Sequence, residues 1–185
     1  MPLPALALTY LGPPATDDDA PALEIAQQVL SGGDSTRLYQ ALVYRLQLAQ
    51  SAEFSVDLRA DLGLLIFQVI LASGVPVEKA ETALQVEIKK ICDQPITHKE
   101  LATAKNQLLT AKLLERDTCE GKAAALAEAA VVFGDPARAN RTLAELQAVT
   151  PEQVQAVAKK WFADSNRLTI EYLPARLKPK TKEKP

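Results

Sequence analysis

The apolar run LLIFQVILA at residues 64–72 limits the folds open to this chain of 185 residues more than any other feature. Only Gln68 interrupts the run, and its β-branched residues favour a strand buried on both faces. Residues 53–59, just upstream, alternate between apolar and polar side chains, which predicts a second strand with one buried face. A short turn at residues 61–63 separates the two segments. We therefore expect an antiparallel hairpin spanning residues 53–72.

Two further strands and a series of helices surround this hairpin. Residues 5–11 form an apolar segment that ends in a Gly-Pro-Pro turn, and residues 167–174 alternate as a strand does. Apolar residues spaced three and four apart predict helices at residues 17–31, at 36–47 and through most of 76–161. The order strand-helix-helix-hairpin-several helices-strand predicts an α+β fold, in which a mainly antiparallel sheet is covered by helices.

The domain boundaries follow from composition. Residues 1–174 carry the periodic pattern and are interpreted as a single domain, large enough to bury a core without disulfides. Residues 175–185 are rich in lysine and proline and have little to bury, so we interpret them as a flexible basic tail. Because the chain opens directly on a strand and its first residues do not resemble a signal peptide, we expect it to be a piece of a longer protein.

Several residues mark helix ends. The acidic run at residues 17–19 is expected to cap the first helix. The Gly32-Gly33 pair is expected to end it, with one glycine in the left-handed conformation. Farther along, Thr97 and Glu100 have the spacing of a capping box, in which each side chain bonds the other residue's backbone amide.

Catalytic and metal-binding chemistry finds little support in these residues. A zinc site needs three or four converging His, Cys or carboxylate ligands. The chain has one histidine, His98, and two distant cysteines, Cys92 and Cys119. A serine nucleophile would have only His98 as its base, and no G-x-S-x-G sequence is present. We therefore predict no catalytic residue and no metal ligand in this chain. The cysteines are interpreted as free thiols, with a disulfide between them left open.

Other ligand classes are also disfavoured. The two glycines at residues 32–33 follow a predicted helix rather than a strand, and no lysine comes after them, so they do not match a phosphate-binding loop. The net charge of −2 argues against a nucleic-acid partner. No run of about eighteen apolar residues occurs, so no membrane span is expected.

Two motifs resemble a known family. The stretch SGGDSTRLYQALV at residues 31–43 resembles the G-G-x-x-S-[ST]-R-L-[FY] element of the C-terminal half-domains of the pitrilysin and mitochondrial-processing-peptidase family of zinc metallopeptidases. ITHKELATAKNQL at residues 96–108 is similar to the family's h-t-x-x-E-L-x-x-A-K-x-x-L, and the order of elements agrees over roughly residues 3–173. The motif residues, for which the resemblance implies a structural role, are Gly32, Gly33, Arg37, Leu38 and Tyr39.

This resemblance implies a function shared with a second half. Family members enclose a peptide chamber between two similar α+β halves, and the catalytic half carries an H-x-x-E-H motif and a downstream Glu that bind zinc. No H-x-x-E-H occurs in this sequence. The resemblance therefore implies the non-catalytic C-terminal half of a zinc-dependent metalloendopeptidase, inactive alone. It would form part of the peptide-binding chamber with an upstream zinc-bearing half-domain or subunit. Zinc would belong to the N-terminal half of the parent, for which a bacterial periplasmic location is a hypothesis.

One departure from the family pattern keeps alternatives open. In many active members an Arg and a Tyr downstream of the motif reach the substrate, but the matching positions here are Val43 and Gln50. Arg45 lies two residues out of register. A structural or assembly subunit of the same fold, without a peptidase role, is therefore the alternative. An independent helical binding module is a third hypothesis.

The sheet face that helices leave uncovered is the expected meeting surface with the partner half. The polar positions of the first hairpin strand would point to it. The candidates for lining the substrate chamber are Glu53, Ser55, Asp57 and Arg59.

Overall fold

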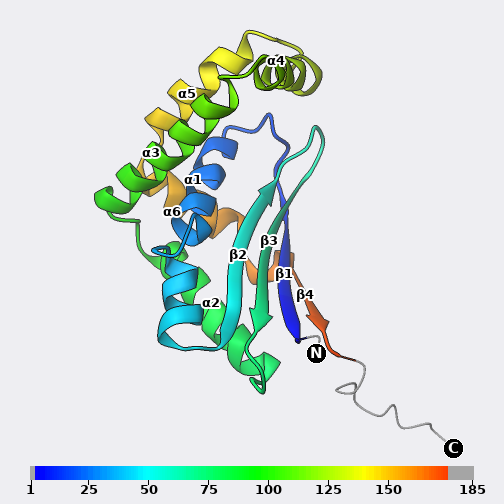
Figure 1. The fold of residues 1–185 in the computed structure, drawn as a ribbon, viewed down its shortest axis with the longest axis vertical. Coiled ribbons are helices and arrows are strands. Elements are labelled where there is room, and N and C mark those ends of the chain that lie inside the picture. The colour runs from blue at the N-terminus through cyan, green and yellow to red at the C-terminus, as the bar shows by residue number, and fades with distance from the viewer. Residues whose placement is uncertain (1–2, 175–185) are drawn as a thin grey trace, which may run out of the picture.

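A computed structural model describes residues 3–174, which form a layer of helices on a four-stranded sheet (Figure 1). The strands lie in the order β2-β3-β1-β4, and each neighbouring pair is antiparallel. Their bounds are β1 (Ala5–Gly12), β2 (Ala49–Asp57), β3 (Gly63–Leu71) and β4 (Arg167–Tyr172). The predicted α+β fold and the predicted hairpin are confirmed. The tail expected at residues 175–185 lies outside the described residues.

The helices come before and after the hairpin and cover one face of the sheet (Figure 1). Helix α1 (Ala20–Ser31) and the π-helix η1 (Tyr39–Arg45) precede it. Those that follow are α2 (Val77–Asp93), α3 (His98–Glu115), α4 (Cys119–Phe133), α5 (Arg138–Ala148), α6 (Pro151–Trp161) and the 3₁₀ helix η2 (Asp164–Asn166). Within residues 3–174, no helix has the length and apolar composition needed to cross a membrane.

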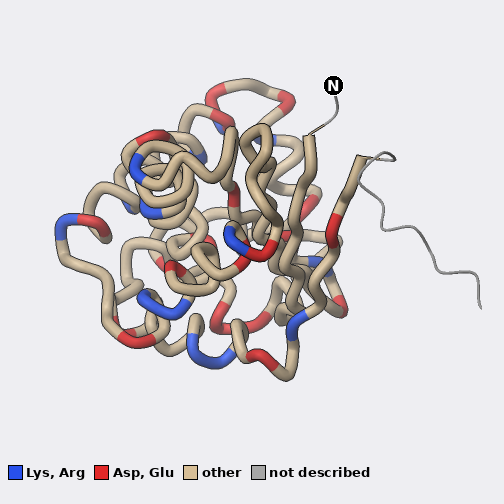
Figure 2. Tube along the Cα trace, turned by 90° about the horizontal axis from the view of Figure 1, so that it is seen from below, with Lys and Arg blue, Asp and Glu red and all other residues tan. Residues whose placement is uncertain are grey.

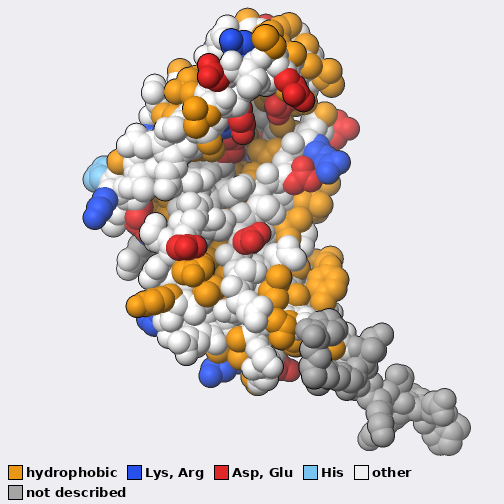
Figure 3. All heavy atoms as spheres, in the orientation of Figure 1, with side chains coloured by type: hydrophobic (Ala, Val, Ile, Leu, Met, Phe, Trp, Pro, Cys, Tyr) orange, Lys and Arg blue, Asp and Glu red, His pale blue; other side chains and the backbone are white. Residues whose placement is uncertain are grey.

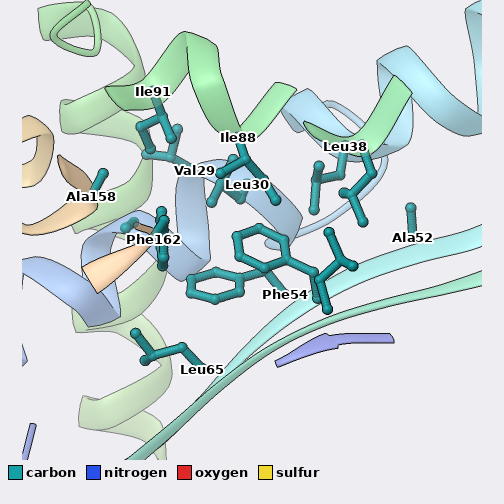
Figure 4. Packing of buried hydrophobic residues seen from close by; sticks show 14 of the residues in the cluster. Val29, Leu30, Leu38, Ala52, Phe54, Leu65, Ile88, Ile91, Ala158 and Phe162 are labelled. Atoms are coloured by element: carbon teal, nitrogen blue, oxygen red, sulfur yellow. The ribbon is translucent and has the colours of Figure 1, made fainter. Parts of the chain in front are cut away.

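The strands alternate, so one set of side chains points into the helix layer. Those that are buried on this inner face are Leu6, Leu8, Tyr10, Phe54, Leu65, Phe67, Val69 and Leu71. Apolar residues of α1, α2 and α6 pack over them, among them Leu30, Ile88 and Ala158 (Figure 4). Burying such side chains stabilises the fold by roughly 1.5–3 kcal/mol each, so this face holds the helices to the sheet.

Four aromatic rings form the centre of the core. Phe67 on β3 stacks on Phe54 of β2 at a centroid distance of 4.2 Å. Tyr10 of β1 and Phe162, at the end of α6, meet Phe67 edge-on at 6.0 and 5.2 Å. These are the geometries that aromatic quadrupoles favour. The cluster joins three strands and the last helix, which are far apart in the sequence.

The prediction that the run at residues 64–72 is buried on both faces was wrong. Along β3 the burial alternates, and Leu64 and Ile70 are each 37% exposed. No other described element covers the second face of the sheet. The strand is apolar on both faces, but only one of them has a neighbour within this chain.

The helix ends agree with those predicted from the sequence only in part. The capping box is confirmed, since the amide of Glu100 donates to the Thr97 hydroxyl (3.2 Å) and the amide of Thr97 donates to the Glu100 carboxylate (2.8 Å). Asp19 occupies the N-cap position of α1 as predicted, but its side chain makes no capping hydrogen bond. Its carboxylate instead accepts hydrogen bonds from Trp161 Nε1 (2.9 Å) and Lys160 Nζ (2.6 Å). Asp19 therefore joins the start of α1 to the end of α6.

The helix predicted at residues 36–47 is shorter and wider than expected. Residues 39–45 form a π-helix, in which the amide of Leu46 reaches back five residues to the Ala41 carbonyl at 3.0 Å. Gln47 ends the helix with a φ of 51°, which is uncommon for a residue other than glycine. The wide turn is a backbone feature that apolar periodicity does not report.

Substitutions on the two faces of β3 should have different effects on stability. Phe67→Ala is expected to lower the free energy of unfolding by about 3–5 kcal/mol, because it leaves a cavity in the aromatic cluster. Ile70→Ala, on the uncovered face of the same strand, is the matched control and should cost about 1 kcal/mol or less. Urea denaturation followed by circular dichroism measures both. Equal losses would contradict the assignment of an inner and an outer face.

Candidate functional site: the outer sheet face and the Gly-Gly motif

The Gly-Gly motif links α1 to α3. Helix α1 ends at Gly32, and Gly33 follows with a φ of 134°, so the predicted positive-φ glycine is present. Arg37 then reaches Glu100 at the start of α3 with two parallel hydrogen bonds of 2.7 and 3.0 Å. Leu38 is fully buried in the core and Tyr39 is half-buried. These contacts join the motif to α3 and to the core.

The ion pair changes the protonation of Glu100. The guanidinium of Arg37 lowers the pKa of Glu100 to about 2, helped by the hydrogen bonds from Thr97. Glu100 therefore remains charged over almost the whole acidic range. The single carboxylate of Glu100 accepts hydrogen bonds both from the Thr97 amide, in the capping box, and from Arg37. These bonds hold the Gly-Gly motif against the N-terminus of α3.

Val43 and Gln50 stand where many active members of the resembled family have an Arg and a Tyr, and neither side chain has the chemistry of the residue it replaces. Val43 is half-buried and packs against the core, whereas Gln50 is exposed on β2. Arg45 lies 3.5 Å from the carboxylate of Glu87, which is only 5% exposed and also binds Lys90 at 2.6 Å. Arg45 is thus engaged with α2 rather than with the sheet.

The four candidate lining residues lie along one edge of the sheet. Glu53, Ser55 and Asp57 pair in register with outward-facing residues of β3 and so share the face that helices leave uncovered. Arg59 lies just beyond the strand and donates to Asp57 at 2.8 and 3.1 Å. That hydrogen bonding lowers the pKa of Asp57 and raises the pKa of Arg59. These residues form a polar border with one compensated ion pair.

The rest of this face is apolar, which the choice of polar candidates missed. Registers across β3, β1 and β4 place alternate residues of each strand beside this border. We call the whole surface the outer sheet face; its members are Ala5, Ala7, Thr9, Leu11, Ser51, Glu53, Ser55, Asp57, Leu64, Ile66, Gln68, Ile70, Leu168, Ile170 and Tyr172. The sequence signal was present, because three of the four outward positions of β3 are apolar: Leu64, Ile66 and Ile70.

Charge is sparse on this part of the molecule. Strands β1 and β3 contain no charged residue, and Figure 2 shows most Lys, Arg, Asp and Glu residues on the helices and loops. Five large apolar side chains on the outer sheet face are at least 37% exposed: Leu11, Leu64, Ile70, Leu168 and Tyr172. An exposed apolar patch of this kind marks a surface for contact with another molecule or domain.

One edge of the sheet is closed by α1. Gln27 accepts a hydrogen bond from the amide of Val56 at 2.9 Å, and Ser31 donates to the carbonyl of Phe54 at 2.8 Å. These bonds occupy backbone groups that another strand would need in order to pair with β2. This part of β2 therefore has no free backbone groups for another strand, and the outer sheet face offers only its side chains for contact.

The donor set does not suit a metal. Within residues 3–174, no three His, Cys, Asp or Glu residues are placed to hold an ion. His98 is exposed at the start of α3, Cys119 is exposed, and Cys92 is half-buried. Both cysteines are free thiols, and burial raises the pKa of Cys92. Zinc therefore does not fit the residues that the structure describes.

Comparison with known proteins identifies the family. A family model described as the peptidase M16 inactive domain matches residues 1–108. The chain belongs to this family. It is 28% identical over 141 residues to uncharacterized zinc proteases of Mycobacterium bovis and Mycobacterium tuberculosis. The match covers 75% of this chain and 31% of each relative, so the chain spans about a third of their length.

Solved structures of related proteins have the same fold as this M16 inactive domain. The inactive peptidase domain from Bordetella parapertussis has a TM-score of 0.86 and 28% identity, over 99% of this chain and 96% of that one. A protease from Helicobacter pylori has the same fold, with a TM-score of 0.87 and 21% identity over 94% of this chain and 42% of that chain. The resemblance drawn from the two sequence motifs is therefore confirmed.

The ion pair between Arg37 and Glu100 should make stability depend on pH. Glu100→Gln keeps an acceptor for the capping box but removes the charge. We expect it to lower the free energy of unfolding by about 1 kcal/mol at pH 7, a small value because solvent screens a half-exposed pair. The folded pKa of Glu100 is depressed, so the contribution is complete above pH 4.5 and is lost as the pH falls toward about 2.

Urea denaturation of both proteins at pH 7 and at pH 3 measures this difference. The difference in unfolding free energy between wild type and variant should narrow at pH 3, because Glu100 of the unfolded wild-type chain is then protonated while the folded carboxylate is still charged. Arg37→Lys should give a similar loss at pH 7, since lysine keeps the charge but not the paired geometry. A gap that stays constant with pH would contradict the ion pair.

Proposed function

We propose that this chain is the non-catalytic C-terminal half of a zinc-dependent metalloendopeptidase, and that it forms part of the peptide-binding chamber with a zinc-bearing half. The likeness to an inactive peptidase domain over 99% of the chain supports the non-catalytic role. The Mycobacterium zinc proteases extend well beyond the part that this chain matches. That additional length accommodates a zinc-bearing half in the same polypeptide.

The observation that carries the proposal is the outer sheet face. It is broad, largely apolar and uncovered within the described residues, and it belongs to a domain whose core is complete without it. A face of this kind can contact peptides of varied sequence, because apolar contact is non-directional. A zinc-bearing half placed opposite would enclose the peptide and position its scissile bond.

The charges of the polar border favour some peptides over others. Asp57 is paired with Arg59, whereas Glu53 has no ion-pair partner among the described residues. The border therefore carries one uncompensated negative charge beside the apolar face. We propose that a peptide with Lys or Arg near this edge is favoured over one with Asp or Glu.

A structural subunit of the same fold is the second candidate. The observation that favours it is the occupation of the substrate-contacting positions by Val43 and Gln50, with Arg45 held by Glu87. Such a subunit would use the outer sheet face for a permanent partner rather than for peptides.

Recombining the two halves separates these candidates. The chain alone is expected to bind no zinc by metal analysis and to cleave no peptide. Mixed with the zinc-bearing half of the same protease, produced as a separate polypeptide, it should give cleavage of a fluorogenic peptide library that EDTA abolishes. A zinc-bearing half that is equally active without this chain, or a stable but inactive complex, would favour the structural subunit.

Variants in the same assay test the chamber wall. Leu168→Lys, on the outer sheet face at 60% exposure, should lower kcat/KM by about tenfold, equivalent to roughly 1.4 kcal/mol. Val86→Lys, at 48% exposure on α2 in the helix layer, is the matched control and should have no effect. Glu53→Lys should shift the preference toward acidic peptides. Equal effects of the Leu168 and Val86 variants would contradict the chamber role.

A further inference from the structure

Strand β4 forms the edge of the sheet opposite β2, and among the described residues it has a neighbour on one side only. The strand order is β2-β3-β1-β4, and β4 pairs with β1. On the outer sheet face, Leu168 and Tyr172 are 60% and 56% exposed. On the inner side, Thr169 and Glu171 are exposed as well, so the helix layer does not cover this strand. Figure 3 shows hydrophobic side chains at the margin of the molecule where β4 lies in Figure 1.

A hydrogen bond at the start of β4 shows which way the backbone groups of β1 point. In an antiparallel sheet, the backbone groups of successive residues point alternately to the two sides of their strand. The Leu11 carbonyl of β1 accepts from Asn166 Nδ2 at 2.8 Å, so Leu11 points toward β4. The opposite edge of the sheet shows the same alternation, because the residues of β2 whose backbone bonds α1 are Phe54 and Val56, two apart.

Every second residue of β4 is therefore directed away from β1. In the register of these strands, Leu168 and Ile170 lie opposite β1 residues that point toward β4, so they bond to β1. The amides and carbonyls of Arg167, Thr169 and Glu171 point to the outer edge instead. Within residues 3–174, no strand pairs with them there. A row of backbone groups of this kind is a template on which another strand can pair.

The side chains of β4 are complementary to those of the same strand reversed. Its central residues are Arg167, Leu168, Thr169, Ile170 and Glu171. An antiparallel copy centred on Thr169 would place Arg167 opposite Glu171 twice. The same pairing sets Leu168 opposite Ile170 and Thr169 opposite its own copy. Opposite charges, apolar side chains and paired threonines are all favourable across strands. The residues with outward backbone groups also meet one another, so their amides and carbonyls can exchange hydrogen bonds.

The charges of β4 do not protect its edge against this pairing. Charged residues on an edge strand commonly prevent association. Here the two charges have opposite sign and lie at equal distances from Thr169, so an antiparallel copy is attracted. Glu171 has no ion-pair partner among the described residues. Arg167 Nη1 contacts Asp164 at 2.7 Å, and the guanidinium has further N–H donors for a second carboxylate.

We propose that two copies of this chain associate through β4, so that two four-stranded sheets join into one continuous antiparallel sheet. The contact is isologous, with a two-fold axis that passes beside Thr169. The outer sheet faces of both copies then lie on the same side and form one surface, with Leu168 and Ile170 of each copy at its centre. The association requires no zinc-bearing half, so it goes beyond the proposed function.

Sedimentation equilibrium of the 185-residue chain tests the association directly. One strand pair is a small interface, so the apparent mass should rise from the 20.0 kDa monomer toward twice that value between about 10 and 500 µM. Glu171→Arg sets cations opposite each other and should weaken association by about tenfold. Glu115→Arg on α3, exposed and with the same charge change, is the matched control and should associate as wild type does. A wild-type chain that stays monomeric throughout would overturn the proposal.

Mixing two variants tests the register. Arg167→Glu sets anions opposite each other and should also weaken self-association. An equimolar mixture of the Arg167→Glu and Glu171→Arg chains restores opposite charges at both positions, so the two variants should associate with each other about as strongly as wild type does. A mixture that stays monomeric while wild type dimerises would contradict pairing through β4. A wild-type dimer that neither variant weakens would assign the contact to another surface and would contradict it too.

Amide hydrogen exchange of the wild-type chain, followed by NMR, needs no variant to fold. The amides of Thr169 and Glu171 should exchange more slowly in concentrated than in dilute solution, because pairing with a second copy protects them. The amide of Ile170 is bonded to β1 in both states and should change less. Equal protection at all three amides, or none at any of them, would overturn the proposal.

Discussion

The contact on which the structure depends is the packing of Phe67 against Phe54, Tyr10 and Phe162. It joins three strands to the end of α6, and through them it brings the last strand β4 beside the first. The helices gain their apolar contacts by covering this face, so within the described residues the opposite face has no covering element. The outer sheet face is therefore a direct result of where the core formed. The same separation lets the domain fold around a complete core while one whole surface remains available for function.

A second set of contacts fixes the motif that first indicated the family. Glu100 caps α3 and pairs with Arg37, so one carboxylate joins the segment after the Gly-Gly pair to the longest helix. Arg45 makes one longer contact, of 3.5 Å, with Glu87 of α2. These polar contacts place η1 between the sheet and α2 without contributing any reactive group. The motif joins the end of α1 to the start of α3 through these contacts.

Sequence reasoning found most of the fold because local signals agreed with it. Alternation in β2, the capping box at Thr97 and the positive-φ glycine that follows α1 are each local, and all occur where expected. The errors have physical causes. An apolar run cannot say whether its second face is covered by its own chain, so β3 was misjudged. Asp17–Asp19 had the residue types of a cap, but Asp19 bonds Trp161 and Lys160, which are remote in sequence. The polar residues of β2 do not indicate the larger apolar part of the outer sheet face, which lies on β1, β3 and β4.

We propose that the outer sheet face forms a wall of the peptide chamber. The most direct test is photo-crosslinking in the assembled protease, with benzoylphenylalanine at position 168 on β4 and, as a reference, at position 86 on α2. Both positions are exposed in the chain alone. On illumination with a bound peptide, position 168 is predicted to crosslink to the peptide and position 86 is not. A peptide that crosslinks from neither position, or equally from both, would contradict the account.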